Sequence, residues 1–279
     1  MRLVALTALT MVAFAANSVL NRMAVANFAT DPAAFAVVRT VAGAAMLVVL
    51  VRLRRGAAFD WSPPARILGG ASLALYLAGF SMAYRSLDAG IGALILFGGV
   101  QVTMFVGAII GRESVPVRRW VGAAISVAGL GWLVWPQGGA VSAVPLHGTL
   151  LMGAAALGWG VYSLAGRSAS DPLASTAANF VTAVPLVAPL LLLGAAVTPA
   201  GAALAVVAGA LTSGLGYALW CAVMPRLGAT RAAVAQLSVP VIAGLGGAVL
   251  LAELPDARAL LGGAAVLLGI AVSLIPRRT

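Results

Sequence analysis

Long apolar stretches follow one another along the whole chain, each separated from the next by a few polar or turn-forming residues. The stretches are continuous and do not alternate with a period of two, which favours helices over strands. Each is close to the ~20 residues that a helix needs to cross a bilayer. We therefore predict ten membrane-spanning helices, at residues 3–26, 33–51, 66–86, 89–111, 118–135, 147–166, 173–194, 200–223, 229–251 and 258–275.

The two halves of the chain repeat one another at a constant offset of 140 residues, without a gap. The repeated pairs are Asp31-Pro32 with Asp171-Pro172, Leu87 with Leu227, Gly107 with Gly247, Glu113 with Glu253, Arg118 with Arg258, Gly122 with Gly262, and Gly129 with Gly269. Two units result, residues 1–138 and 145–279, with a short linker between them.

Each unit holds five predicted spans, and an odd number of crossings turns the second unit upside down relative to the first. Inverted repeats are typical of secondary transporters, whose substrate site lies near the middle of the membrane where the repeats meet. We predict an all-α polytopic membrane protein in which two inverted five-helix repeats form a basket-like bundle.

The composition also indicates that lipid surrounds this bundle. The chain has 279 residues, of which 62% are hydrophobic and 9% are charged, with a mean hydropathy of +1.07. A soluble domain of this size needs a more polar exterior, so most of the surface must face lipid. Only helices and closed barrels satisfy their backbone there. The first apolar run is too long for a typical signal sequence, and we expect it to be retained as the first span.

The charge pattern predicts an orientation. The net charge is +10, and all 17 basic residues are arginines. They lie at the ends of spans rather than in one patch with interleaved aromatics, so we do not expect nucleic-acid binding. With the N-terminus in the cytoplasm, thirteen arginines fall on the inner side, and the outer side holds Arg22, Arg39, Arg85 and Arg258. The positive-inside rule therefore predicts that both termini are cytoplasmic.

Groups for catalysis or metal binding are missing from the predicted spans. The seven acids all fall at span ends, and the one histidine, His147, lies at the start of a span. The single cysteine, Cys221, has no partner for a disulfide or a metal site. We therefore expect no enzyme, no metal and no cofactor. Proton-coupled transporters usually carry a carboxylate within the membrane, so we expect uncoupled transport or coupling by a less direct route.

Neutral polar and aromatic side chains recur in the middle of several spans. Asn17 and Asn21 are four residues apart, so they share one helix face. Polar groups in hydrocarbon cost several kcal/mol unless they are paired, so such faces should point inward. Each residue could instead simply join two helices. The predicted cavity residues are Asn17, Asn21, Tyr76, Phe80, Phe97, Gln101, Trp159, Tyr162, Ser163, Tyr217, Trp220 and Gln236.

Two arginines near the outer ends of the first two spans are candidates for a gate. Arg22 and Arg39 could reach the interface as isolated snorkelling side chains. Alternatively, they could pair with Glu253 or Asp88 and close the cavity on the outer side. Pro240 interrupts another span and permits a kink, which could be a hinge or static. We assign the gating role to Arg22, Arg39, Glu253 and Pro240.

The spans at 118–135 and 258–275 carry faces of small residues. Gly122 and Ser126 are four residues apart, as are Gly269 and Ser273. Such faces allow helices to approach closely. They predict scaffold or subunit contacts rather than substrate contacts, so the protein would be a monomer or a homodimer through these glycine-rich spans.

Several of these segments resemble a known family. They are the segment NSVLNRMA late in the first span, the Asp31-Pro32 pair ahead of Arg39, and the segment GAIIGRESVPVRRWVGAAISVAGL with its counterpart GAVLLAELPDARALLGGAAVLLGI. The chain resembles the ten-helix EamA-type form of the drug/metabolite transporter superfamily. The resemblance implies a central cavity lined mainly by the first, third, fourth, sixth, eighth and ninth spans. The aromatic and amide lining is similar to what the YddG-like branch of bacterial amino-acid exporters would need.

Together these observations predict a secondary transporter of the bacterial inner membrane that works by alternating access. It would export small metabolites, with aromatic or neutral amino acids first. The alternatives are efflux or uptake of nucleosides or amphipathic drugs, and a membrane scaffold that transports nothing. The expected partners are a small-molecule substrate and the lipid bilayer.

Overall fold

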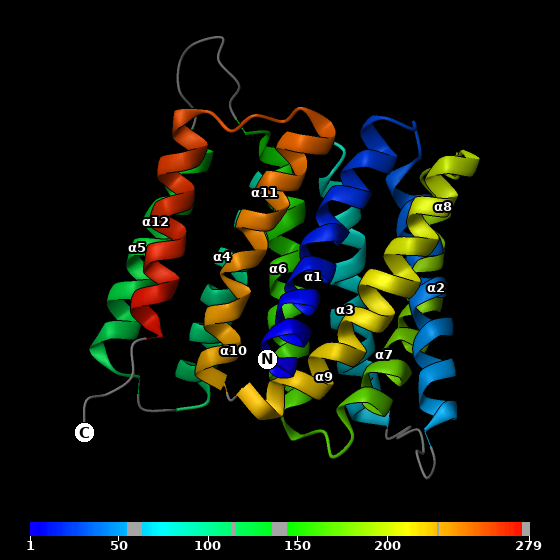
Figure 1. Ribbon diagram of the computed structural model, residues 1–279, viewed down its shortest axis with the longest axis horizontal. Coiled ribbons are helices and arrows are strands. Elements are labelled where there is room, and N and C mark those ends of the chain that lie inside the picture. Colours follow the sequence, from blue (N-terminus) through cyan, green and yellow to red (C-terminus); the bar gives the residue numbers. More distant parts are fainter. Residues whose placement is uncertain (55–62, 113–114, 136–143, 228, 275–279) are drawn as a thin grey trace.

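The computed structural model describes residues 1–54, 63–112, 115–135, 144–227 and 229–274, and within these ranges the regular structure is helical. The α-helices are α1 (Arg2–Ala26), α2 (Pro32–Leu53), α3 (Pro63–Ala83), α4 (Ala89–Ile110), α5 (Val117–Val134), α6 (Leu146–Ala165), α7 (Pro172–Val187), α8 (Pro199–Val207), α9 (Gly216–Leu227), α10 (Ala229–Gln236), α11 (Ser238–Leu251) and α12 (Ala257–Ser273) (Figure 1). Short 3-10 turns are η1 (Gly166–Ser168) and η2 (Ala188–Leu192), and η3 (Ala208–Leu215) is a π-helix.

The repeated Asp-Pro pairs each start a helix. The Asp31 carboxylate accepts a hydrogen bond from the backbone N–H two residues later (2.8 Å), and Asp171 accepts one from three residues later (3.1 Å). The proline that follows each aspartate lies in the first turn, where its missing N–H costs nothing. Thr198 and Asp256 cap α8 and α12 in the same way. The same local chemistry therefore sets the start of four helices.

Eight helical segments among the described residues are long and apolar enough to cross a membrane. Three of them are interrupted. α7 continues into η2, η3 joins α8 to α9 within Pro199–Leu227, and α10 and α11 meet at an offset within Arg231–Leu251. α5 and α12, with 18 and 17 residues, correspond to the predicted fifth and tenth spans and fall outside this set. The prediction of an all-helical polytopic membrane protein is confirmed.

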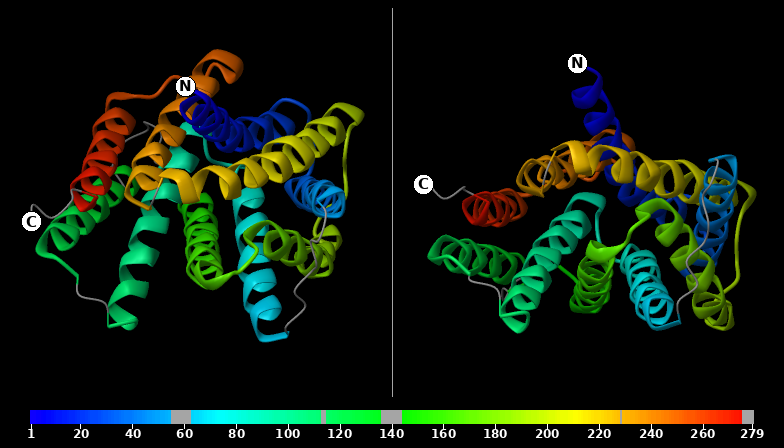
Figure 2. Two further views of the ribbon diagram at one scale, coloured as in Figure 1. Left: turned by 60° about the horizontal axis from the view of Figure 1, so that its bottom comes forward. Right: turned by 90° about the horizontal axis from the view of Figure 1, so that it is seen from below.

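The helices stand side by side in one bundle with two distinct ends. The α1–α2 and α11–α12 links lie at the upper end in Figure 1, and α1 begins at the lower end. Seen from below, the paired α5 and α12 occupy one edge of the bundle, and α2 and α7 occupy the opposite edge (Figure 2). The middle of the bundle is formed by packed pairs that include α3 with α6, α4 with α6, α4 with α11 and α1 with α9.

The glycines of α5 and α12 face each other, and their contacts exchange between repeated positions. Gly122 lies against Gly269, and Gly129 lies against Gly262. Each glycine of α5 therefore meets the counterpart of the other one, which is the pattern that a twofold axis between two copies produces. A side chain at any of the four would meet the partner helix, in most cases its backbone.

The contact between α5 and α12 shows what the glycine faces do in this structure. They are buried against one another within a single chain, so they make scaffold contacts, one of the two predicted roles. Whether the protein is a monomer or a homodimer stays a prediction. The two helices lie close together for the reason given in the sequence analysis, because small residues let two backbones approach.

Replacing Gly122 with valine should push α5 away from α12, because the added carbons would meet the backbone of Gly269 and Ser273. We expect a loss of about 1–3 kcal/mol in stability, as for other overpacked sites, measured as a lower midpoint of thermal unfolding in detergent. Gly131 lies on the same helix and has nothing within 4 Å of an added Cβ. Gly131→Val is therefore the control, and equal losses in the two variants would contradict the proposed packing.

Candidate substrate site

A small cavity lies in the middle of the bundle, between α1, α3, α4, α6, α9 and the end of α10. Its volume is about 20 Å³, which is room for about one water molecule. Both halves of the chain contribute to its walls. The lining residues are Phe14, Asn17, Ser18, Tyr76, Phe80, Leu96, Phe97, Trp159, Tyr217 and Gln236.

Aromatic rings form one continuous wall of this cavity. The ring centroids of Tyr76 and Trp159 are 5.1 Å apart, and those of Trp159 and Tyr217 are 5.3 Å apart. Phe80 adds a tilted contact with Tyr76 at 5.4 Å. Such tilted and edge-to-face pairs are favourable beyond the area they bury. The rings therefore hold one another in place and present an apolar surface to anything that enters.

Asn17 supplies an amide to the cavity, and the π-helix η3 holds that amide. The side-chain oxygen of Asn17 accepts hydrogen bonds from Thr212 Oγ1 (2.8 Å) and Ser213 Oγ (3.1 Å), and its nitrogen donates to the carbonyl of Ala13 (3.2 Å). Thr212 and Ser213 both belong to η3. Short π-helical segments frequently mark functional sites in helices.

Arg39 lies directly behind the aromatic wall and has no solvent exposure. Its Nε donates to Ser213 Oγ (3.2 Å), and its Nη2 donates to the hydroxyl of Tyr76 (3.2 Å). The guanidinium carbon lies 4.8 Å from the ring centroid of Phe80. Nη1 has no hydrogen-bond partner among the residues that the structure describes. The cavity therefore has a buried positive charge beside it.

This position corrects the predicted role of Arg39 in an ion pair at the outer end. Arg39 lies two turns into α2, and α2 approaches η3 so closely that a Cβ on Gly209 would collide with the carbonyl of Arg39. That approach directs the side chain into the bundle, toward neutral hydroxyls and rings. The prediction that Arg39 pairs with Glu253 or Asp88 is wrong.

The structure brings seven of the predicted cavity residues to the cavity wall: Asn17, Tyr76, Phe80, Phe97, Trp159, Tyr217 and Gln236. Asn21 and Gln101 make helix-to-helix contacts instead. Asn21 donates to Ser81 Oγ (2.9 Å), and Gln101 donates to Ser273 Oγ on α12 (2.8 Å). These two residues therefore join helices to one another, which was the alternative to a place in the cavity wall.

The remaining predicted residues form a second layer behind the wall. The Tyr162 ring stacks on Trp159 at 5.3 Å, and its hydroxyl lies 2.9 Å from Thr176 Oγ1. Ser163 donates to the carbonyl of Trp159 (2.7 Å). Trp220 meets Phe14 edge-on at 5.8 Å. These residues therefore support the wall from outside the cavity.

Three wall residues were missed by the sequence analysis: Phe14, Ser18 and Leu96. Phe14 precedes Asn17 by three residues, so the two lie on one helix face. That spacing could have identified Phe14. Ser18 and Leu96 carry no comparable signal, because small and aliphatic residues are common everywhere in this chain.

Arg22 forms a network that fastens the upper end of the bundle. Its Nε lies 2.6 Å from Glu253 Oε1, and its Nη2 lies 3.4 Å from Asp88 Oδ1. Its Nη1 also donates to the carbonyl of Tyr84 (3.1 Å). The second oxygen of Glu253 accepts a hydrogen bond from the backbone N–H of Ala89, at the start of α4 (2.8 Å). We call Arg22, Glu253 and Asp88 the upper lock, which joins α1 to the α3–α4 and α11–α12 links.

Pro240 lies in the first turn of α11, just after the offset at Leu237 that separates α10 from α11. A proline is tolerated in a first turn because it removes no bond that the helix needs there. The interruption of this span lies next to Gln236, a wall residue. The offset thus places the end of α10 at the cavity.

A larger groove of about 620 Å³ lies away from the centre, between α4, α11 and α12. Its lining includes strongly exposed apolar side chains, such as Leu245 (62% exposed) and Leu254 (81% exposed), so the groove opens on the surface of the bundle. Among the described residues, no aromatic ring or side-chain amide lines it. The polar groups of the groove are at its charged upper end, at Asp88, Glu253, Asp256 and Arg258. The central cavity combines rings with neutral amides and hydroxyls from both halves of the chain, so it is the candidate substrate site, although it would have to widen to admit a ligand larger than water.

Comparison with known proteins agrees with this architecture. The sequence profile of the EamA-like transporter family matches residues 146–275. A protein of Pseudomonas aeruginosa described as uncharacterized protein PA1977 is 45% identical to this chain over an alignment of 281 residues. The alignment covers 99% of this chain and 96% of that protein. The chain belongs to the EamA-like transporter family.

The EamA-like chain also has a solved structural neighbour. A crystal structure described only as that of a protein matches with a TM-score of 0.66 and 20% identity, over 95% of this chain and 98% of the other. This likeness concerns the fold alone. The predicted membership of the drug/metabolite transporter superfamily is confirmed, and the EamA-like chain is a multi-pass membrane protein of a transporter family.

The upper lock predicts unequal effects of removing its two acids. Glu253→Gln should lower stability by about 1.5–3 kcal/mol, because its 2.6 Å pair with Arg22 is largely shielded, with Glu253 only 13% exposed. Asp88→Asn should cost about 0–1 kcal/mol, because its 3.4 Å pair is 48% exposed on the acid side.

Thermal unfolding of both variants in detergent measures the difference. The glutamine can still accept the hydrogen bond from Ala89, so the comparison isolates the ion pair. A loss for Asp88→Asn that equals or exceeds the loss for Glu253→Gln would show that the lock is not centred on Glu253.

Proposed function

We propose that this EamA-like transporter exports small metabolites, with aromatic or neutral amino acids first, across the bacterial inner membrane. The observation that carries the proposal is the central cavity, where aromatic rings meet neutral amide and hydroxyl groups from both halves of the chain. Binding sites for small molecules typically combine an apolar lining with a few placed polar groups. An amino acid offers the matching pair, an apolar side chain and a polar end.

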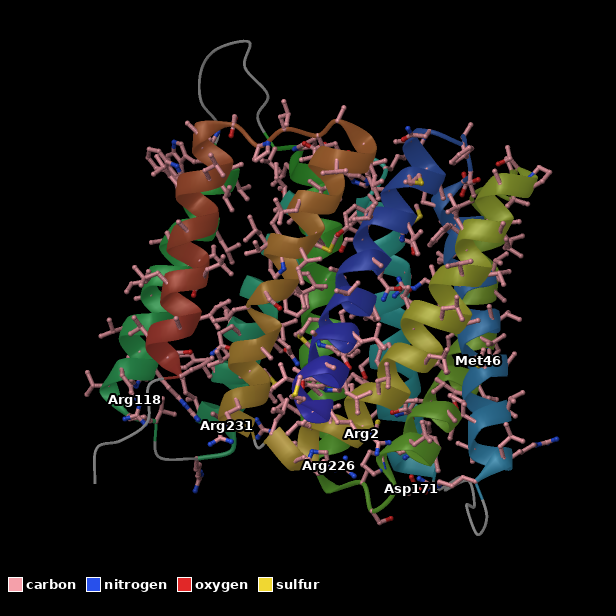
Figure 3. The ribbon with its side chains drawn as sticks, viewed as in Figure 1. Arg2, Met46, Arg118, Asp171, Arg226 and Arg231 are labelled. Atoms are coloured by element: carbon pink, nitrogen blue, oxygen red, sulfur yellow. The ribbon has the colours of Figure 1, made fainter. Side chains whose placement is uncertain are left out.

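The arginines support an orientation with the lower end in the cytoplasm. Arg2, Arg118, Arg226 and Arg231 all lie at the lower end of the bundle (Figure 3). Cytoplasmic loops of membrane proteins are enriched in Lys and Arg. In this orientation the N-terminus is cytoplasmic, and the upper lock faces the outside.

The upper lock supports a state that is closed toward the outside. Opening on that side requires Arg22 to separate from Glu253, because the pair joins the end of α1 to the link before α12. We propose that residues 1–138 and 145–279 act as two inverted repeats that rock against each other around the cavity. Pro240 and the neighbouring offset at Leu237 would let α10 and α11 bend during this motion.

The charge distribution supports transport without proton coupling. No acid is among the described residues that line the cavity. The described acids lie at helix ends, as caps or in the upper lock. A carboxylate that binds and releases a proton during transport is usually placed inside the membrane. We therefore propose that the substrate gradient drives export.

Counterflow in proteoliposomes tests the function. We expect exchange of labelled phenylalanine or another neutral amino acid, unchanged by an imposed pH gradient. Flux that follows the pH gradient would contradict the uncoupled mechanism. Exchange of nucleosides alone would assign another substrate class, and the absence of exchange with any substrate would favour a scaffold.

A pair of tryptophan variants links the flux to the cavity. Trp159→Leu removes a ring of the cavity wall and should raise the phenylalanine concentration for half-maximal exchange about tenfold, equivalent to ~1.4 kcal/mol. Trp135 is 70% exposed at the end of α5, so Trp135→Leu is the matched control and should behave as wild type. Equal kinetics in both variants would place the transport path elsewhere.

A further inference from the structure

Arg39 is a fully buried cation that no described acid neutralises. The carboxylates in the described part of the chain belong to five residues, and each lies at a helix end. Asp31, Asp171 and Asp256 cap helices, and Glu253 and Asp88 pair with Arg22. All five are therefore committed to other contacts, and the charge of Arg39 has no counter-ion within the described part of the chain.

The neutral contacts of Arg39 offset only part of the cost of burying it. A cation over an aromatic face gains a modest amount of free energy, and Arg39 has such a contact with Phe80. The cost of placing an unpaired charge in the membrane interior is larger than this gain. Ionisable residues retained there usually take part in a functional site. The cost therefore points to a counter-ion that arrives from outside the protein.

Another buried arginine shows what a structural role looks like in this bundle. Arg66 donates to the Ser175 carbonyl (2.8 Å), to Ser175 Oγ (3.0 Å) and to Asn179 Oδ1 (2.9 Å). These contacts attach the start of α3 to α7. Arg39 makes two hydrogen bonds, to a serine and to a tyrosine, and the tyrosine, Tyr76, also lines the cavity.

The neighbours of Arg39 connect it to the cavity. Tyr76 accepts its Nη2 hydrogen bond, Phe80 lies against its guanidinium, and both residues line the cavity. Ser213 accepts its Nε hydrogen bond and also donates to Asn17, a third wall residue. A shift of the Tyr76 ring would therefore open a path from the cavity to the guanidinium, whose Nη2 would lose its partner and whose Nη1 has none among the described residues. Two such donors match the two oxygens of a carboxylate.

The π-helix η3 gives independent support for a site at this position. Its Gly209 lies against the carbonyl of Arg39, and its Ser213 holds the guanidinium and the Asn17 amide. A π-helix is rare and is frequently found at functional sites. Here it places a hydroxyl between the buried cation and the cavity wall.

We propose that Arg39 binds the carboxylate of the transported molecule and that this makes the site selective for small carboxylates with an aromatic or apolar tail. The proposal rests on the transport function proposed above and adds the group that recognises the substrate. The aromatic wall holds the tail. In an amino acid, the same ring faces also stabilise the ammonium group. Amines and amides that lack a carboxylate would leave Arg39 unpaired and bind weakly.

Ligand-dependent thermal stability tests the recognition without relying on transport. Phenylacetate and L-phenylalanine should raise the unfolding midpoint of the purified wild-type protein, because a ligand of the native state stabilises it. Phenethylamine and L-phenylalaninamide keep the ring but lack the carboxylate, and they should leave the midpoint unchanged. Equal stabilisation by the amine and the carboxylate would overturn the proposal. This comparison decides the matter even if a variant of Arg39 folds poorly.

The Arg39→Gln variant assigns the effect to the residue. Its apparent affinity for phenylacetate should be lower by about tenfold or more, as expected for the loss of a charge-assisted pair. Arg85 is an exposed arginine near the upper end, so Arg85→Gln is the matched control and should respond as wild type. A wild-type response to phenylacetate in Arg39→Gln would overturn the proposal.

Flux measurements separate this proposal from the proposed function. Arg39-dependent binding of phenylacetate and phenylalanine with no exchange in proteoliposomes would support the recognition site and contradict the transport. Exchange of phenylalanine that persists in Arg39→Gln and is competed equally by phenylalaninamide would support the transport and overturn the role of Arg39.

Discussion

In a lipid bilayer, a polar group finds hydrogen-bond partners only within the protein, and this constraint shapes the whole molecule. It makes the described regular structure helical. It also explains why Asn17, Asn21 and Gln101 each bond another protein group. Against this background, Arg39 is a fully buried charge with no acid beside it among the described residues. A ligand that carries a negative charge would pair with Arg39 and would remove the cost of burying that charge alone.

The frame of the molecule and its candidate site use the repeat in opposite ways. In the frame, Gly122 meets the repeat counterpart of Gly129, and Gly129 meets the counterpart of Gly122, so the same contact is made twice. In the cavity, the symmetry is broken, since Asn17 corresponds to Leu157 and Trp159 corresponds to Val19. A frame of matched contacts can rock between two similar arrangements, while an asymmetric lining can recognise an asymmetric molecule.

The upper lock is also asymmetric. Arg22 corresponds to Tyr162 in the second half, where the hydroxyl meets Thr176 rather than an acid. The strong ion pair therefore closes one end of the bundle, and the neutral contact lies toward the other. In the proposed transport cycle, this difference would favour the state that is closed at the upper end. A substrate that pairs with Arg39 in the middle of the bundle could bind one of the two states more tightly than the other. That difference in affinity would offset the preference for the closed upper end.

Much of the fold follows from local signals in the sequence. The Asp-Pro pairs start α2 and α7 because the aspartate caps the helix and the proline fits its first turn. The aromatic and amide residues of the wall were predictable because uncommon residue types in the middle of a span must face inward. The sequence could not show which helix such a face meets. Gln101 therefore found Ser273, and the glycine faces found each other within one chain.

The placement of Arg39 depends on tertiary structure in the same way. Its distance from Asp31 along α2 suggested the outer end, whereas its environment is set by η3 and Gly209 on a distant span. Residues 208–215 contain no proline, and their Thr-Ser-Gly run does not by itself indicate a π-helix. Contacts between distant segments therefore decided the position of the residue that we propose to recognise the substrate.

The most direct test of this account is a structure determined with 4-bromophenylacetate, in which the bromine marks the tail of the ligand. The account predicts a carboxylate within about 3 Å of the Arg39 guanidinium and the bromine against the ring wall of Tyr76 and Trp159. A ligand bound instead in the groove between α4, α11 and α12, with the contacts of Arg39 unchanged, would contradict it.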